Sequence, residues 1–156
     1  MAVVIRRLEE HDEVKNFDCG DDALNNYLKR HAWTNQQKRS IGVSYVALDE
    51  NAPRTVLGYF TLAMASVPRD TFPKKCVRGL PPYDLPLILL ARLAVDRRFA
   101  GRGLGHALIS EALRIEKEDI GHIPLHQAGL AWGVAKGVNL VLRNDDSLEL
   151  RWVKMP

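Results

Sequence analysis

Three glycines at alternate positions, Gly101, Gly103 and Gly105, separate an apolar stretch from an amphipathic one. Glycine tolerates positive φ and lets a ligand come close to its backbone N–H. The residues that follow carry apolar side chains at helical spacing, so the turn opens into a helix. A helix N-terminus has unpaired N–H groups and a partial positive charge, which together favour phosphate. The stretch therefore predicts a pocket for a phosphorylated cofactor. The alternative is a glycine-rich turn that binds nothing.

The spacing of these glycines excludes two common phosphate-binding loops. A Walker loop needs Gly-Lys-Ser/Thr after its glycines, and none follows here. The dinucleotide fingerprint needs G-x-G-x-x-G in the first βα unit of a parallel sheet. This chain has G-x-G-x-G, about two thirds of the way along its sequence.

Apolar periodicity and turn residues predict the elements around this turn. Residues 87–95 are almost wholly apolar and indicate a central strand, and residues 103–117 indicate a helix. Asp21 or Asp22 can cap an earlier helix that continues to about Lys38. The other expected elements are an edge strand at 2–8, an antiparallel hairpin at 42–48 and 55–67, a long loop at 68–86, a strand at 123–130, a short helix at 131–138 and a strand at 147–153.

The order β-α-β-β-β-α-β-α-β predicts an α/β fold, with a mixed central sheet and helices on its faces. A length of 156 residues, 46% of them hydrophobic, suits a single domain spanning residues 1–156. Two cysteines give no disulfide framework. His122 and His126 have Pro124 between them, so a helical metal pair is not expected, and we predict no metal. No apolar run could span a bilayer, and Arg6 and Arg7 argue against a signal peptide, so we expect a cytoplasmic protein without membrane contact.

The net charge is only +3, but basic residues gather in short clusters. Arg98 and Arg102 lie beside the predicted pocket, where they would attract phosphate. Arg92 is a charge inside an apolar strand, and we expect it to support the site or to reach the substrate. A further group could contact a nucleic acid, although solvated surface charge is the favoured interpretation of any single cluster: Lys29, Arg30, Lys38 and Arg39.

The run Leu93-Ala94-Val95-Asp96, an arginine-containing loop, Gly-x-Gly-Leu-Gly and a helix together resemble motif A of the GNAT N-acetyltransferases. The resemblance implies the GNAT-like fold and acetyl-CoA as cofactor. Gly103 and Gly105 match the family pattern Gln/Arg-x-x-Gly-x-Gly/Ala, whereas Ala100 stands where Gln or Arg is usual. That departure removes a side chain but leaves the N–H groups. The implied cofactor residues are Leu93, Ala94 and Val95 along the pantetheine, and Arg98, Gly101, Arg102, Gly103, Leu104 and Gly105 around the pyrophosphate.

Further motifs narrow the resemblance to one GNAT subgroup, the toxins of bacterial type II toxin–antitoxin modules. These motifs are Phe17-Asp18-Cys19-Gly20, Leu24-x-x-Tyr27-Leu28, Ser44-Tyr45-Val46 and Gly58-Tyr59-Phe60-Thr61-Leu62, within a likeness over residues 5–115. The resemblance implies an N-acetyltransferase that acetylates the α-amine of aminoacyl-tRNA and so blocks translation. It also implies a ribbon-helix-helix antitoxin as partner and a homodimer.

The C-terminal part departs from the subgroup. The family has a tyrosine there that acts as general acid near the CoA sulfur. Its place falls near Val134 or Ala135, neither of which can donate a proton, so the catalytic acid is unassigned and reduced activity is expected. Water, a serine, Tyr59 or Tyr83 could replace it, unless an insertion shifts the alignment.

Two other functions stay open. One is a catalytically degenerate, CoA-binding homologue that serves as antitoxin partner or co-repressor. The other is a GNAT enzyme that acetylates a small amine or a protein N-terminus.

Overall fold

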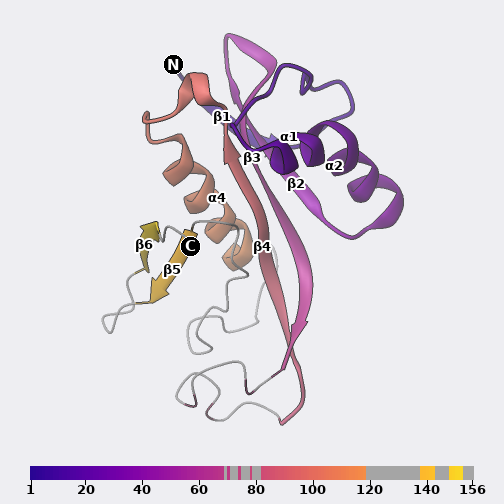
Figure 1. Cartoon of the computed structure of the whole chain (residues 1–156), viewed down its shortest axis with the longest axis vertical. Helices are drawn as coiled ribbons and strands as arrows, with labels where there is room; N and C mark the ends of the chain where they lie inside the picture. Colours follow the sequence, from indigo (N-terminus) through magenta and orange to yellow (C-terminus); the bar gives the residue numbers. More distant parts are fainter. Residues whose placement is uncertain are drawn as a thin grey trace.

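The computed structural model describes residues 1–68, 70, 74, 78, 82–118, 138–142 and 148–152. Four strands form one antiparallel sheet in the order β1-β2-β3-β4 (Figure 1). The strands are β1 (Val3–Arg7), β2 (Val43–Asp49), β3 (Ala52–Val67) and β4 (Leu85–Val95). The expected edge strand and the expected hairpin are thus confirmed. The mixed sheet required a further strand at 123–130, which lies outside the described residues.

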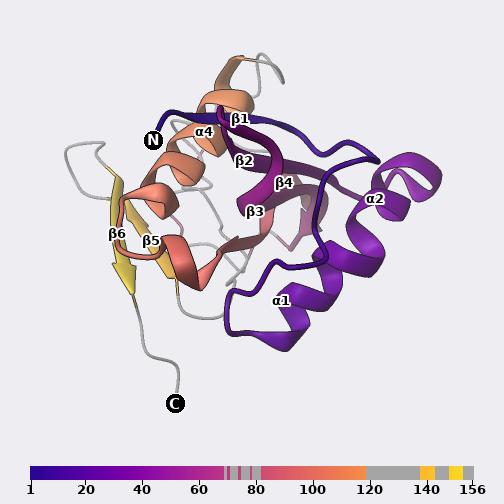
Figure 2. The same cartoon turned by 90° about the horizontal axis from the view of Figure 1, so that it is seen from above.

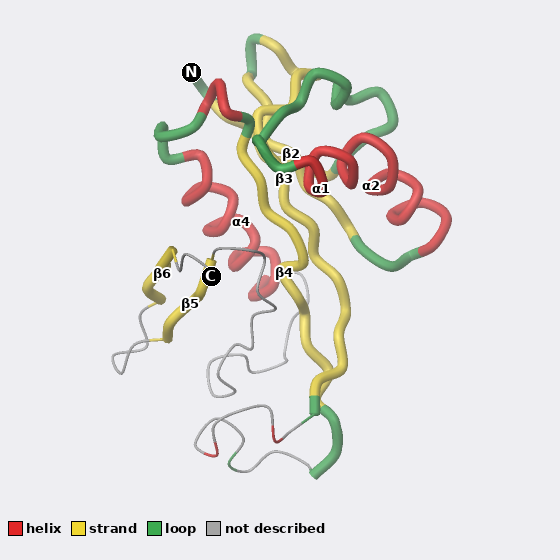
Figure 3. Tube along the Cα trace, in the orientation of Figure 1, coloured by secondary structure: helices red, strands yellow, loops and turns green. Residues whose placement is uncertain are grey.

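A continuous helical segment connects β1 to β2 (Figure 3). It consists of α1 (Asp22–Asn26), the π-helical η1 (Tyr27–His31), α2 (Ala32–Thr34) and the π-helical η2 (Asn35–Arg39). The segment begins as predicted, because the Asp21 carboxylate accepts the N–H groups of Ala23 and Leu24 at 2.9 and 3.1 Å. It ends at Ser40, whose φ of 52° lies in the left-handed region.

The sheet lies between this segment and the helix α4 (Leu104–Glu118), as Figure 2 shows. Side chains alternate along each strand, so β3 contributes to a separate core on each face. Phe60 belongs to the core under α4, together with Leu104 and Leu108, while Tyr59 belongs to the core under the N-terminal helices, with Tyr27. The alternation along the strands and the helical spacing along α4 therefore determine on which face of the sheet each side chain is buried.

The C-terminal part differs more from expectation. β5 (Val138–Leu142) and β6 (Leu148–Trp152) pair as an antiparallel hairpin. β6 confirms the strand expected at 147–153, whereas no strand was expected at 138–142. The predicted helix at 131–138 is wrong at residue 138, where β5 begins, and its residues 131–137 lie outside the described residues. Only Asn139 interrupts the apolar residues of 138–142, and so short a run does not distinguish a strand from a helix by its pattern. The predicted loop at 68–86 ends two residues early, because Pro86 pairs with Ser66 at the start of β4.

No helix in the described ranges is long and apolar enough to cross a membrane.

The close approach of α4 to β3 gives a test of the packing. A Cβ on Gly58 would lie 3.0 Å from the carbonyl oxygen of Ala94 and 3.0 Å from Cδ1 of Leu108. Gly58→Ala should therefore lower the free energy of unfolding by about 1–3 kcal/mol, measured by urea denaturation. Gly105→Ala is the control, because its Cβ would meet Cγ2 of Val95 at 3.9 Å, an ordinary contact. Equal urea midpoints for the two variants would contradict the packing described here.

Candidate functional site

The end of β4 provides an open strand edge. Among the described strands, β4 pairs with β3 and has no neighbour on its other side. Leu93 and Val95 pack toward the core under α4, and Ala94 is buried on the opposite face. Because all three side chains are occupied in this way, the backbone is the part of this segment that could pair with a ligand.

A bulge precedes this segment. Leu90 pairs with Leu62 and Arg92 with Thr61, so Ala91 has no partner on β3. A bulge bends a strand and locally disturbs its pairing, and bulges are common next to functional sites. The amino-acid sequence gives no signal for it, since Ala91 simply ends the apolar run at residues 87–91 and no glycine or proline stands beside it.

Backbone conformation explains two of the three glycines in the turn after β4. β4 continues through the 3-10 turn η4 (Arg97–Phe99) and residues 100–103 into α4 (Figure 3). Gly101 and Gly103 have φ of +75° and +79°, and a Cβ on either would meet no atom within 4 Å. These two positions therefore need glycine for its φ and not for close packing. Gly105 has room for a side chain and lacks positive φ.

The first turn of α4 presents unpaired backbone donors. The N–H of Ala107 donates to the carbonyl of Gly103 at 3.1 Å. The four N–H groups from Gly103 to His106 have no acceptor in the part of the chain that the structure describes. The first turn contains no acidic residue. Donors, helix dipole and lack of negative charge together make this an anion-binding geometry.

The two arginines predicted beside the pocket differ in their partners. Arg98 donates to both carboxylate oxygens of Asp96, from Nε and from one Nη, each at 2.9 Å. Burial alone would raise the pKa of Asp96, but these bonds, together with the backbone N–H groups of Arg98 and Asp18, lower it below its usual value. Arg102 is exposed and has no carboxylate partner among the described residues; its guanidinium carbon lies 5.7 Å from the ring centroid of Phe99. Contact of Arg98 with phosphate stays a prediction, and Arg102 has the more available charge.

Arg92 lies on the opposite face of the sheet from α4. Its guanidinium carbon is 3.7 Å from the ring centroid of Tyr27, a cation–π contact, and the side chain is half-buried. No carboxylate in the described ranges pairs with it. The other predicted substrate residues are all exposed and lie on the helical segment of this same face: Lys29 and Arg30 on η1, and Lys38 and Arg39 on η2.

The two tyrosines considered as alternative acids lie in different surroundings. Tyr59 is 0% exposed, and its hydroxyl donates to the carbonyl of Leu24 at 2.8 Å, so burial raises its pKa. Tyr83 is 65% exposed, but it precedes the eleven residues of β4. The extended chain of β4, about 35 Å long, therefore separates Tyr83 from the turn that contains Gly101 and Gly103. Val134 and Ala135 lie outside the described residues.

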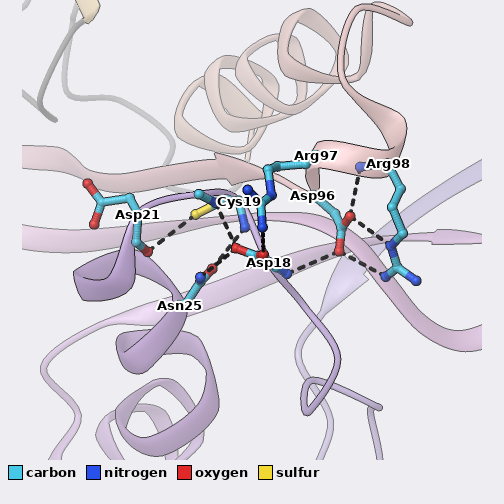
Figure 4. A network of polar contacts seen from close by, with 8 residues as sticks. Asp18, Cys19, Asp21, Asn25, Asp96, Arg97 and Arg98 are labelled. Atoms are coloured by element: carbon cyan, nitrogen blue, oxygen red, sulfur yellow. Dashed lines mark hydrogen bonds and ion pairs between the residues drawn. The ribbon is translucent and has the colours of Figure 1, made fainter.

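Sequence reasoning missed a polar network that joins this turn to the N-terminal loop. Figure 4 shows Asp18, Asn25, Asp96, Arg97 and Arg98 in contact across the start of η4. The one available signal was Asp96, an acidic residue directly after an apolar strand. Its partner could not be deduced, since Asp18 lies 78 residues away.

In the described ranges, no group of three or more His, Cys, Asp or Glu side chains could hold a metal ion. The expectation that no metal is bound stays a prediction.

Comparison with known proteins bears on this geometry. No model of a protein family matches the chain. A tRNA-acetylating toxin of Mycobacterium tuberculosis is 35% identical over 108 residues, which are 69% of this chain and 62% of the relative. The probable toxin TacT of Sinorhizobium fredii is 24% identical over 105 residues, which are 67% of this chain and 56% of the relative. The chain thus spans less than two thirds of the length of either curated relative.

Solved structures agree in fold and in sequence. AtaT complexed with acetyl-methionyl-tRNAfMet is 30% identical with a TM-score of 0.66, covering 74% of this chain and 69% of AtaT. A tyrosine-to-phenylalanine mutant of KacT is 29% identical with a TM-score of 0.67, over the same shares of the two chains. Sequence identity and fold therefore agree over most of the described residues, and this chain belongs to the GNAT toxins of toxin–antitoxin modules.

Proposed function

We propose that this chain transfers an acetyl group from acetyl-CoA to the α-amine of an aminoacyl-tRNA and thereby blocks translation in the cytoplasm. The row of acceptor-free amides at the start of α4 carries the proposal. The relatives support it, since one is named a tRNA-acetylating toxin and AtaT has been solved with acetyl-methionyl-tRNA and with acetyl-CoA.

The residues of the turn fit the cofactor. In this proposal the amides of residues 103–106 and the free charge of Arg102 hold the pyrophosphate. The open edge of β4 at Leu93, Ala94 and Val95 pairs with the pantetheine, and its N–H groups polarise the thioester carbonyl. When bound, acetyl-CoA supplies the activated acetyl group. Gly101 and Gly103 shape the turn so that no side chain covers the amides.

The basic face is the proposed tRNA surface. The guanidinium carbon of Arg92 lies 3.7 Å from the ring centroid of Tyr27, and no carboxylate in the described part of the chain pairs with it, so its N–H groups can donate to a phosphate. Lys29, Arg30, Lys38 and Arg39 extend this charge along the helical segment. Such contacts make binding depend strongly on salt.

An antitoxin is the proposed protein partner. AtaT has been solved bound to the C-terminus of the antitoxin AtaR. We expect the antitoxin of this chain to have a ribbon-helix-helix DNA-binding part and the toxin to form a homodimer.

A second candidate function rests on the missing tyrosine. KacT and AtaT have both been studied as tyrosine-to-phenylalanine mutants, whereas this chain has no tyrosine after Tyr83. Loss of one general acid costs about 10²–10⁴-fold in rate. The chain would then be a slow or inactive CoA-binding homologue that acts through its antitoxin.

Radiolabelled acetyl-CoA tests the proposed reaction. Incubation of the chain with labelled acetyl-CoA and charged tRNA should give label that mild alkali releases as N-acetyl amino acid. Deacylated tRNA, which lacks the amine, should stay unlabelled. CoA binding without transfer would favour the second candidate, and label on a polyamine or a protein N-terminus would favour an ordinary GNAT enzyme.

Gly105→Asp tests the amide cradle. An Asp in the first helical turn is favourable to α4, so the free energy of unfolding should stay equal or rise. The same charge would face the pyrophosphate, so calorimetry should show CoA affinity lower by about tenfold or more. Gly105→Asn adds similar volume without the charge and should lose less. Unchanged affinity in the Asp variant would remove the turn from the cofactor site. Gly103 is less suitable, because its φ of +79° strains any substitution.

Tyr59→Phe separates a structural hydroxyl from a catalytic one. Removal of the hydrogen bond to Leu24 should lower the free energy of unfolding by about 1 kcal/mol, measured with urea. The acetyl-transfer rate should not change. A rate loss of about a hundredfold at unchanged stability would identify Tyr59 as the acid after all.

A further inference from the structure

A buried aspartate anchors the chain just before the cofactor turn. Asp96 is 1% exposed and follows the last residue of β4. Its N–H donates to the carbonyl of Leu57 on β3 at 2.8 Å. Its carboxylate accepts four hydrogen bonds: the N–H of Asp18 at 3.1 Å, and the N–H, Nε and one Nη of Arg98, each at 2.9 Å. All the acceptor capacity that burial would otherwise leave unsatisfied is used.

The N-terminal loop completes this anchor from the other side (Figure 4). The carbonyl of Asp18 accepts the N–H of Arg97 at 2.9 Å, and its carboxylate pairs with the Arg97 guanidinium. The same carboxylate accepts the N–H of Gly20 and Nδ2 of Asn25, both at 2.9 Å. Gly20 has φ of +86°, which lets the loop turn close to Arg97. The two loops therefore hold each other through backbone as well as side-chain groups.

The anchor ends where the free amides begin. The N–H groups of Arg97, Arg98, Phe99 and Ala100 all have acceptors, on Asp18, Asp96, Asp96 and Arg97. Beyond Ala100 the N–H groups of residues 101–106 have no acceptor among the described residues, and the last four of them lie at the start of α4. Gly101 and Gly103 are the most permissive residues of this turn. Buried Leu104 holds the far end of the turn against the sheet, so the hydrogen bonds of Asp96 are the fixed point at its near end.

We propose that Asp96, held by Asp18 and Arg98, is a positioning residue that fixes the amides at the start of α4 and thereby sets the affinity for CoA. The inference rests on the proposed function, in which this turn binds the pyrophosphate. Asp96 acts through the backbone of η4 and does not touch the cofactor. The N-terminal loop thus becomes part of the cofactor site, although it lies 78 residues away in sequence.

Asp96→Asn gives a result whose sign separates two explanations. If Asp96 only neutralised charge, the variant would release Arg98 and remove a negative charge near the pyrophosphate, so CoA would bind more tightly. If Asp96 positions the turn, the variant loses the fork from Arg98 and CoA should bind about tenfold more weakly. Calorimetry with CoA measures the difference.

A second buried aspartate that accepts two hydrogen bonds from one arginine side chain provides the matched control. Asp12 is 8% exposed and accepts Nη1 and Nη2 of Arg6 at 2.9 and 2.7 Å, besides the N–H of Glu9 at 2.8 Å. Among the described residues, no hydrogen bond or ion pair connects Asp12 to the turn at residues 97–103. Both Asp12→Asn and Asp96→Asn should therefore lower the urea midpoint. Asp12→Asn should leave the CoA affinity unchanged.

Asp18→Asn covers the case in which Asp96→Asn does not fold. The Asp18 side chain is 42% exposed, and the backbone bonds to Asp96 and Arg97 remain in the variant, so it should fold and weaken CoA binding a few-fold. Suppose that Gly105→Asp weakens CoA binding, so that the turn is the cofactor site. If Asp96→Asn and Asp18→Asn then both leave CoA binding unchanged or make it tighter, the inference is overturned. If the unsubstituted chain binds no CoA, or Gly105→Asp leaves affinity unchanged, the proposed function itself fails.

Discussion

Backbone N–H groups without acceptors are costly in a folded protein unless water or a ligand receives them, and here four lie together at the start of α4. Gly101 and Gly103 keep the approach to them open, since no side chain projects from either position. The helix behind them is fixed, because Leu104 and Leu108 are buried against the sheet at Gly58. The rest of the described structure thus holds a set of donors in place for an anion that the protein itself does not supply.

The sheet divides two tasks between its faces (Figure 2). The face under α4 supports the turn at residues 100–103, while the face under the N-terminal helices carries Arg92 on Tyr27 and the exposed basic side chains. The proposed reaction between acetyl-CoA and an aminoacyl-tRNA needs both ligands near one strand. β4 would meet this need, because Arg92 and the open edge at residues 93–95 are adjacent along it. The network of Asp18 and Asp96 then ties the helical segment of one face to the turn that serves the other.

Strong local patterns explain what could be predicted from the sequence. β4 and α4 begin and end within two residues of expectation, because a long apolar run marks the strand and apolar residues at helical spacing mark the helix. The cap at Asp21 is also local, since it depends on residues two and three positions away. Tertiary contacts are a different matter. No local pattern indicates that the Asp96 carboxylate accepts the N–H of Asp18, that Tyr59 donates to a helix carbonyl, or that β4 bulges at Ala91. The strand at 138–142 was missed because a helix was expected to end at residue 138 and the short apolar stretch after it has no strict alternation.

Amide NMR during a CoA titration can show whether these donors bind the cofactor, since it reports on each backbone N–H separately. A phosphate that accepts a hydrogen bond shifts the proton resonance of that amide downfield. We predict the largest downfield shifts at Gly103, Leu104, Gly105 and His106, with saturation at one common CoA concentration. Saturable binding that leaves these four resonances in place and shifts amides elsewhere would contradict it.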